Sequence, residues 1–288
     1  MSNRFQSTFF GGLDVEFEFD AQIGSMTNYA IGGRAEVLVK PQSTDSLSQL
    51  LRRCTQSNIP MRILGNGMNL LVDDVGVDGI VVKLEHACFK STRFNRDGSI
   101  DSLHAMAGAD LAMTLMDTVR RGLEGLSAMA GIPASIGGAV RMNAGGKYGA
   151  ISDAIETVTC LTRDGELVTY ETQSLNFGYR ESKISDPLIL SATFQLEPSD
   201  PVELRDRVKK IFAWKRTRQP LADASAGCVF KNPVNHENER VSAGQLIDQS
   251  GLKGFRVGGA FVSDSHANFI VTSPDATARH VIELMNLV

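Results

Sequence analysis

The chain has 288 residues, a formal net charge of −4, and 42% hydrophobic against 22% charged residues. These values are typical of a water-soluble globular protein, and the length predicts about two domains of roughly 100–200 residues each. The mild acidity and the lack of a long Lys/Arg run exclude a typical nucleic-acid-binding protein. No stretch resembles a signal peptide or reaches the roughly 18 uninterrupted apolar residues of a membrane helix, which predicts no membrane association.

The four cysteines are far apart in the sequence and form no C-x-x-C pair. This pattern predicts free thiols in a reducing cytoplasm, with neither a disulfide framework nor a metal site. Nothing in the composition indicates an obligate protein partner.

The first part of the chain alternates predicted strands and helices. Residues 36–39, 62–64 and 79–82 are strand-like, and Ser43 or Thr44 is suited to cap a helix with apolar residues at helical spacing up to Cys54. We expect Cys54 to be a small core residue on that helix.

In the second part, a strand over 103–107 precedes a helix that starts near Asp110 and stops at Gly122. Runs 158–161 and 167–170, joined through Asp164-Gly165, predict a hairpin whose Cys160 packs inside the sheet. Residues 201–216 read as a charged amphipathic helix. These mixed elements indicate α+β units rather than one doubly wound sheet.

The last part contains two further predicted helices. Ser242 and Gln245 fit a capping box for a short helix that runs to Gly251. A final helix begins at Asp275 or Thr277 and stops on apolar residues without a cap, from which we expect the sequence to be truncated at Val288.

Two glycine-rich segments are candidate ligand sites. In 64–72, two glycines and two asparagines follow a predicted strand and precede the strand-like residues 70–72. Successive backbone N–H groups in such a loop are suited to bind a phosphate. A plain tight turn between strands explains the pattern equally well. The segment 130–146 is made mostly of small residues. It favours a bound diphosphate over the alternative, a close backbone crossing between domains.

Cys228 lies in the run Ala-Gly-Cys-Val-Phe-Lys-Asn-Pro, with small residues before it and a charged, amide-bearing turn after it. Small neighbours allow a bulky ligand to approach the sulfur. On these residues alone, Cys228 is a nucleophile, a proton donor, a ligand or a packing residue.

Other charged groups remain ambiguous from the residues alone. Arg180, in Phe-Gly-Tyr-Arg-Glu-Ser, suits a carboxylate or enolate ligand, or pairs with Glu181 at the surface. Lys215, Arg216 and Arg218 either hold a phosphorylated substrate or form a solvated helix end. His266, in a polar loop, is read as incidental.

Taken in order, these segments resemble the UDP-N-acetylenolpyruvoylglucosamine reductase family. The matching segments are 27–33, 65–72, 122–149, 177–182, 226–233 and 243–270. Each is weak alone, but the ordered set is specific. The short connection between Arg180 and the next strand resembles the family branch that lacks a tyrosine-bearing loop.

The resemblance implies an α+β protein with a two-subdomain FAD-binding unit of the vanillyl-alcohol-oxidase/PCMH type and a C-terminal α+β substrate domain. The implied boundaries are 1–85, 86–198 and 199–288. FAD is the implied cofactor, NADPH the reductant and a UDP-sugar the substrate. The implied FAD-binding residues are Thr27, Gly65, Asn66, Gly67, Met68, Asn69, Leu70, Gly131, Ile132, Pro133, Ser135, Gly137, Gly138 and Asn143.

The implied reaction is reduction of the enolpyruvyl ether of UDP-N-acetylglucosamine to UDP-N-acetylmuramate, a step of peptidoglycan precursor synthesis. Arg180 matches the family's residue beside the substrate carboxylate, and Cys228 stands where the family usually has a serine that donates a proton. A free thiol, with a pKa of about 8.5, is protonated at neutral pH and is a far better acid than a hydroxyl. The candidate substrate-binding residues are Tyr179, Arg218, Lys231 and Asn232.

Two positions depart from the family pattern. Met68 stands where a serine is usual, and Glu283 does not lie in the Pro-Glu-Val-Arg-like motif that carries the family's second catalytic acid. The alternatives are therefore another FAD oxidoreductase on the same scaffold and a non-catalytic flavin-binding protein.

Overall fold

The computed structural model describes residues 5–94 and 101–288. These residues form two compact units, each assembled from several stretches of the chain. Unit 1 takes in the described residues of Met1–Asp20, Glu36–Gly65 and Asp78–Val208, whereas unit 2 takes in Ala21–Ala35, Asn66–Val77 and Lys209–Val288. The three domain boundaries expected from the sequence stay predictions.

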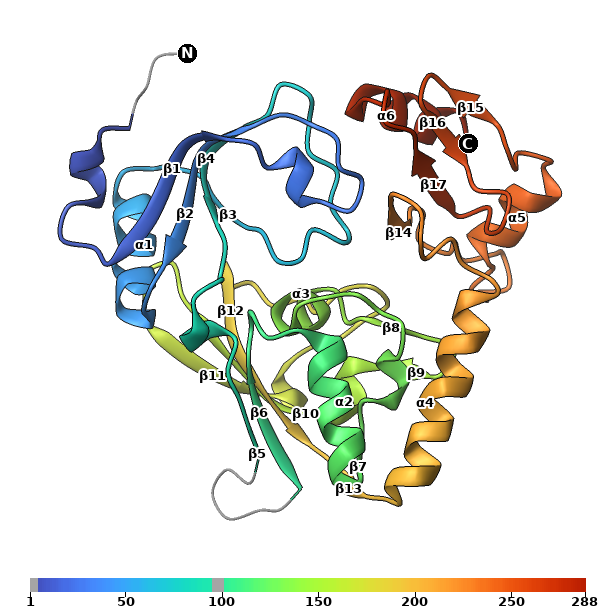
Figure 1. The fold of residues 1–288 in the computed structure, drawn as a ribbon, viewed down its shortest axis with the longest axis horizontal. Coiled ribbons are helices and arrows are strands. Elements are labelled where there is room, and N and C mark those ends of the chain that lie inside the picture. The colour runs from blue at the N-terminus through green and yellow to red at the C-terminus, as the bar shows by residue number, and fades with distance from the viewer. Residues whose placement is uncertain (1–4, 95–100) are drawn as a thin grey trace. The chain divides into compact units, whose positions relative to one another are not determined.

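The helices and strands follow the predicted order closely (Figure 1). The α-helices are α1 (Thr44–Gln56), α2 (Leu111–Arg121), α3 (Ile136–Arg141), α4 (Pro201–Arg216), α5 (Ala243–Gln249) and α6 (Ala278–Leu287). The strands up to the middle of the chain are β1 (Val15–Ala21), β2 (Ala35–Pro41), β3 (Met61–Ile63), β4 (Val77–Val82), β5 (Thr92–Phe94), β6 (Ser102–Met106), β7 (Leu123–Glu124), β8 (Gly145–Gly146) and β9 (Gly149–Ala150). The remaining strands are β10 (Ile155–Leu161), β11 (Leu167–Glu171), β12 (Leu188–Gln195), β13 (Glu197–Pro198), β14 (Ser225–Cys228), β15 (Arg256–Val257), β16 (Ala260–Val262) and β17 (Phe269–Thr272).

The first sheet has the strand order β1-β2-β4-β3, with β3 and β4 parallel. Helix α1 starts after Ser43, whose Oγ accepts the N–H of Ser46 at 3.1 Å, as the sequence predicts. Its apolar stripe packs into the same core as the buried side chains of β2 and β4. Cys54 is 1% exposed within that core, which confirms its packing role.

The second sheet has the order β11-β10-β12-β6-β5, and each strand in it is antiparallel to its neighbours. The predicted hairpin is β10 and β11, and Cys160 is fully buried in it. Helix α2 begins after Asp110, which accepts the N–H of Met113, and ends at Gly122 with φ +66°. This left-handed conformation is the reason a glycine terminates the helix.

Unit 2 contains a sheet of order β14-β17-β16-β15 together with α5 and α6. Its core joins Tyr29 to Val262, Val281 and Leu284. Asp74 accepts the N–H groups of Ala278 and Arg279, at 2.8 and 2.9 Å, so a residue of the early chain caps the last helix. Separate, largely antiparallel sheets, with helices in each unit, confirm the α+β prediction.

One predicted strand is wrong. Residues 70–72 are in a loop, because that stretch is fastened to the 28–33 segment: the N–H of Asn28 bonds Gly67 O at 3.1 Å and that of Gly33 bonds Asp73 O at 2.8 Å. In the part of the chain that the structure describes, no helix combines the length and apolarity needed to cross a bilayer.

Candidate functional site

Cys228 is the last residue of β14, and it pairs with Phe269 of β17. The ladder is irregular between Ser225 and Cys228, where Gly227 has φ +73°. The thiol belongs to a partly exposed residue and is not in a disulfide. A reagent or ligand can therefore reach Cys228, unlike the buried Cys54 and Cys160.

Two residues of the 27–33 motif hold the start of β14. The side-chain amide of Asn28 donates to Ser225 O at 2.6 Å. Tyr29 is 3% exposed and hydrogen bonds the backbone of Ala226, while its burial raises the pKa of the phenol to about 12. The motif therefore supports the Cys228 strand directly, a role that its sequence alone did not reveal.

The residues after Cys228 are held by amide side chains. Asn268, 3% exposed, bonds Phe230 through its side-chain amide and accepts the N–H of Val229 with its backbone oxygen. The Oδ1 of Asn232 accepts the N–H of Ala243 at 3.0 Å, at the start of α5. Lys231 is exposed. The substrate contacts expected of Lys231 and Asn232 stay predictions.

The 131–138 segment leads into α3, and Ser135 caps this helix through the N–H of Gly138 at 3.3 Å. The N–H groups of Ile136 and Gly137 donate to Ala109 O and Ala107 O, at 2.9 and 2.8 Å. A diphosphate would have to compete with these acceptors for the three N–H groups. The cofactor contacts expected of Gly131, Ile132, Pro133, Ser135, Gly137 and Gly138 stay predictions.

The end of the first glycine loop lies against this segment. A Cβ on Gly65 would stand 2.7 Å from Ser135 Oγ, so the absence of a side chain permits the approach. The rest of the loop belongs to unit 2, with Thr27. There the hydroxyl of Thr27 donates to Gly24 O at 2.8 Å, and Gly67 lies against the backbone of Met26. The contacts expected of Thr27 and of Asn66, Gly67, Met68, Asn69 and Leu70 are likewise untested.

Arg180 lies in a tight turn of unit 1. Gly178 and Glu181 exchange backbone hydrogen bonds at 2.8 and 3.3 Å, and Arg180 itself has φ +57°. Asn143 fastens the turn, because its Nδ2 donates to Gly178 O at 3.1 Å and its Oδ1 accepts the N–H of Ser152 at 3.3 Å. The structure thus joins the glycine-rich segment to the Arg180 turn within one unit.

Arg141 strengthens the same junction. Its guanidinium donates to Ile184 O at 2.6 Å and Asp186 O at 2.8 Å, just after the turn. Burial lowers the pKa of this guanidinium below its usual value. Tyr179 and Arg180 are partly exposed, the former by 39%. Both side chains are accessible on a backbone that other residues hold in place.

Ser182, next to the Arg180 turn, is a buried polar residue that the sequence reasoning did not select as a candidate. It is 2% exposed, and its Oγ has no hydrogen-bond partner among the described residues. A buried hydroxyl without a protein partner costs free energy, so this Oγ is suited to bond a ligand or water. The only feature of the sequence that could have indicated Ser182 is its position two residues after Arg180.

The three basic residues before Gln219 differ in their exposure to solvent. Lys215 is 7% exposed, and desolvation lowers the pKa of its ammonium to about 8. Arg216 and Arg218 are exposed, and the Arg218 guanidinium lies 4.9 Å from the centre of the Trp214 ring. His266 is partly buried, and desolvation lowers its pKa. The substrate contact expected of Arg218 stays a prediction.

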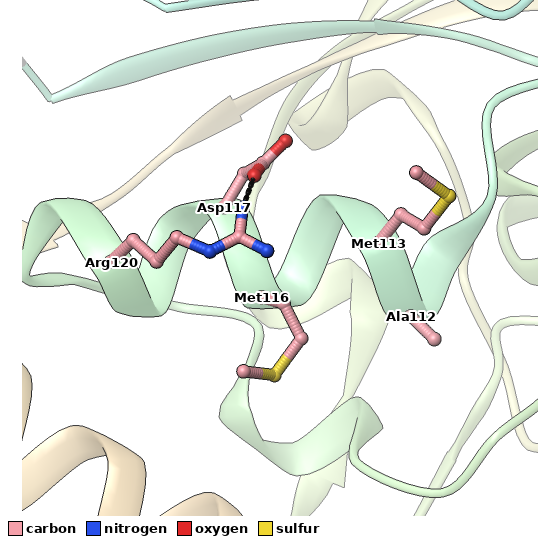
Figure 2. A pocket seen from close by; sticks show the side chains of 5 residues that line it. All are labelled: Ala112, Met113, Met116, Asp117 and Arg120. Carbon is pink, nitrogen blue, oxygen red and sulfur yellow. Dashed lines mark hydrogen bonds and ion pairs between the residues drawn. The ribbon is translucent and has the colours of Figure 1, made fainter.

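A shallow hollow on the outer face of α2 contains none of the predicted site residues (Figure 2). It is lined by Ala112, Met113, Met116, Asp117 and Arg120, and the last two form an ion pair along the helix. Met113 is 72% exposed. These side chains come from a single helix, and the two charged ones among them are already paired with each other.

Comparison with known proteins gives matches over nearly the whole chain. The model of the FAD binding domain matches residues 35–171, and that of the UDP-N-acetylenolpyruvoylglucosamine reductase C-terminal domain matches 219–288. UDP-N-acetylenolpyruvoylglucosamine reductase of Streptococcus pneumoniae (strain JJA) is 38% identical over 279 residues, or 96% of this chain and 88% of that protein. The protein of the same name from Lactobacillus acidophilus is 37% identical over 96% and 89% of the two chains. A solved UDP-N-acetylenolpyruvylglucosamine reductase from Thermus caldophilus has a TM-score of 0.81 at 34% identity, over 96% of this chain and 94% of its own.

Proposed function

This chain belongs to the UDP-N-acetylenolpyruvoylglucosamine reductase family, and we propose that it reduces UDP-N-acetylglucosamine enolpyruvate to UDP-N-acetylmuramate with FAD and NADPH. It is an FAD-dependent oxidoreductase of peptidoglycan precursor synthesis. The observation that supports this most is that the family relationship spans 96% of the chain, including the Cys228 strand and the Arg180 turn. We place the reaction in the cytoplasm.

Residues of unit 1 fit an FAD cofactor. The matched FAD binding domain includes the Gly65 loop end and the 131–138 segment, which the Gly65–Ser135 approach brings together. Small side chains there leave the backbone accessible to a flat or phosphorylated group. The partnerless hydroxyl of Ser182, on the Arg180 turn, adds a buried donor for a ligand.

Bound FAD would supply the hydride chemistry, with NADPH as the source of the hydride and C3 of the enolpyruvyl group as its acceptor. The protein must then stabilise the negative charge that spreads from C2 into the substrate carboxylate. We assign this to Arg180, because a guanidinium gives a carboxylate paired, charge-assisted hydrogen bonds that strengthen as charge develops. The Asn143 and Arg141 bonds keep its turn in place.

C2 also requires a proton, and we assign its donation to the Cys228 thiol. The thiol is accessible, and the strand that carries it is held on both sides. In this assignment the S–H proton passes to C2 and leaves a thiolate, which solvent reprotonates. A thiol in place of a serine hydroxyl makes the enzyme sensitive to alkylating and oxidising reagents.

Two finer assignments belong to this proposal. The short connection from Arg180 to β12 supports the branch without the tyrosine-bearing loop. Glu283 is ion-paired with Arg279 at 2.7 Å on α6, and we do not assign it the role of the family's second acid. Sequencing the gene downstream of the Val288 codon decides whether a Glu-Val-Arg-like motif follows.

The thiol is tested with two substitutions at one position. Cys228→Ser should retain turnover and resist iodoacetamide, whereas Cys228→Ala should be reduced by NADPH but reoxidised slowly by substrate. Stopped-flow absorbance of the flavin separates these half-reactions. Normal reoxidation in Cys228→Ala would remove the thiol from the mechanism.

The cofactor and Arg180 are tested independently of the thiol. Purified protein should be yellow, and colourless protein that cannot be reconstituted with FAD contradicts the proposed function. Arg180→Ala should keep FAD and slow reoxidation by substrate, with Lys183→Ala, an exposed cation of the same turn, as the control. Equal reoxidation rates in the parent and Arg180→Ala would contradict the role of Arg180.

A further inference from the structure

Asn268 makes an unusual set of contacts with the residues that follow Cys228. It directly precedes β17 and is 3% exposed. Its backbone oxygen accepts the N–H of Val229 at 2.8 Å, and its side-chain Oδ1 accepts the N–H of Phe230, also at 2.8 Å. Its Nδ2 donates to Phe230 O at 3.0 Å. One residue thus supplies three hydrogen bonds to two consecutive residues.

The side-chain amide of Asn268 makes the hydrogen bonds to Phe230 that a neighbouring β-strand would otherwise make. It offers one acceptor and one donor to the N–H and C=O of Phe230, which is what an adjacent β-strand would offer. This substitute is needed because β14 ends at Cys228 and its ladder is irregular between Ser225 and Cys228. Regular pairing therefore does not fix the chain beyond the thiol.

The bond to Val229 acts on Cys228 itself. The Val229 N–H belongs to the peptide unit that carries the Cys228 carbonyl, so its bond to Asn268 O fixes the orientation of that unit. On the other side of the thiol, Gly227 has φ +73°, a conformation with little side-chain restraint. The bonds that Asn268 makes therefore fix the chain on the C-terminal side of Cys228, directly next to the thiol-bearing residue.

Asn268 is fixed in turn by its neighbours. Its own N–H bonds His266 Nδ1 at 3.2 Å, and the His266 ring packs edge-on against Phe269 at 4.9 Å between centroids. Phe269 is the residue that pairs with Cys228. Asn268, His266 and Phe269 therefore contact one another, and two of them, Asn268 and Phe269, also hold Cys228 or the residues directly after it.

We propose that Asn268 is a positioning residue that directs the Cys228 thiol for proton transfer. This rests on the proposed function of Cys228 as proton donor, and it adds a residue that acts only through Cys228. Proton transfer requires the donor within hydrogen-bond reach of its target, so a small rotation of the Cys228 peptide unit is expected to slow it.

The test is Asn268→Asp, which preserves shape and one acceptor but replaces the Nδ2 donor with an oxygen that faces Phe230 O. Losing this bond and placing a carboxylate oxygen against the part-buried Phe230 carbonyl is expected to slow reoxidation of the reduced holoenzyme by substrate about tenfold or more. KM for NADPH and the rate of flavin reduction should stay at parent values. Asn286→Asp, an exposed position on α6, is the matched control.

A second readout needs no turnover. Iodoacetamide labelling of the holoenzyme, followed by peptide mass spectrometry, compares Cys228 with Cys88, the other partly exposed thiol. Asn268→Asp should change the labelling rate of Cys228 at least about threefold and leave that of Cys88 unchanged. If the Asp variant does not fold, Asn268→Ser removes both side-chain bonds to Phe230 without adding a charge. The bond from the Val229 N–H to the backbone oxygen of Asn268 is kept in either variant.

Parent labelling and parent reoxidation rates in both variants would overturn the proposal. Equal acceleration at Cys228 and Cys88 would also overturn it, because general loosening is not positioning. Normal turnover of Cys228→Ala would contradict a different proposal, that Cys228 donates the proton. The labelling rates would still show whether Asn268 orients the thiol.

Discussion

Lys215→Met is expected to stabilise the protein at neutral pH. Lys215 is 7% exposed, and desolvation lowers the pKa of its ammonium from 10.5 to about 8. Burial disfavours the charged form, so folding is opposed whenever Lys215 is protonated. Methionine has a flexible apolar side chain of similar length and carries no charge.

The magnitude follows from the fall of the pKa. At about 1.4 kcal/mol for each tenfold change in proton affinity, the fall from 10.5 to about 8 corresponds to about 3 kcal/mol. Between these two pH values the unfolded chain binds the proton and the folded chain does not, so stability increases as the pH rises. Below pH 8 both states are protonated, and the full cost is present.

The gain of Lys215→Met should therefore be largest at pH 7, at up to about 3 kcal/mol, and should shrink as the pH approaches 10.5. Urea unfolding followed by circular dichroism at pH 7 and pH 10 measures it. Lys210→Met, on the same helix but exposed, is the control and should change little. A Lys215→Met protein no more stable than the parent at pH 7, or with a gain independent of pH, would refute the reasoning.

Three further changes test other parts of the structure. Glu85 bonds Lys40 and Lys83, and these two ammonium groups hold the pKa of its carboxyl at about 2. Glu85→Gln should lower the free energy of unfolding at pH 7, measured with urea, by about 1 kcal/mol. The unfolding free energies of the two proteins should converge as the pH falls from 4.5 towards 2. Asn143→Asp loses the donor to Gly178 O and should lower kcat/KM for the enolpyruvyl substrate about fivefold or more, whereas an unchanged value would separate Asn143 from Arg180. Gly67→Ala should lower the melting temperature by several degrees, because Gly67 has φ +69° and a Cβ would lie 2.4 Å from Met26 O; an unchanged melting temperature would show that the loop relaxes freely.

Local signals explain what the sequence could predict. Ser43 before α1 and Gly122 after α2 act through their own side chain or backbone conformation, and both were found at the expected helix ends. The Asp164-Gly165 turn likewise placed the β10–β11 hairpin. Family resemblance then supplied the cofactor and substrate class, which no single motif specified.

Partners distant in sequence explain what it could not predict. Lys215 was grouped with Arg216 and Arg218, yet only Lys215 is buried, because burial depends on distant segments. The N–H groups at the start of α3 read as open for phosphate, but Ala107 and Ala109 accept two of them. Asn268, 40 positions after Cys228, has no local signature that links it to the thiol.

The capping of α6 by Asp74 has a consequence for synthesis of the protein. The Asp74 carboxylate can form these hydrogen bonds only after Ala278 and Arg279, just over 200 residues later in the chain, have been synthesised. Stretches 21–35 and 66–77 leave the ribosome early, whereas most of their unit is translated last. We therefore expect nascent chains stopped before α6 to expose these early stretches to proteases and chaperones, even where the strands and helices of unit 1 have already formed.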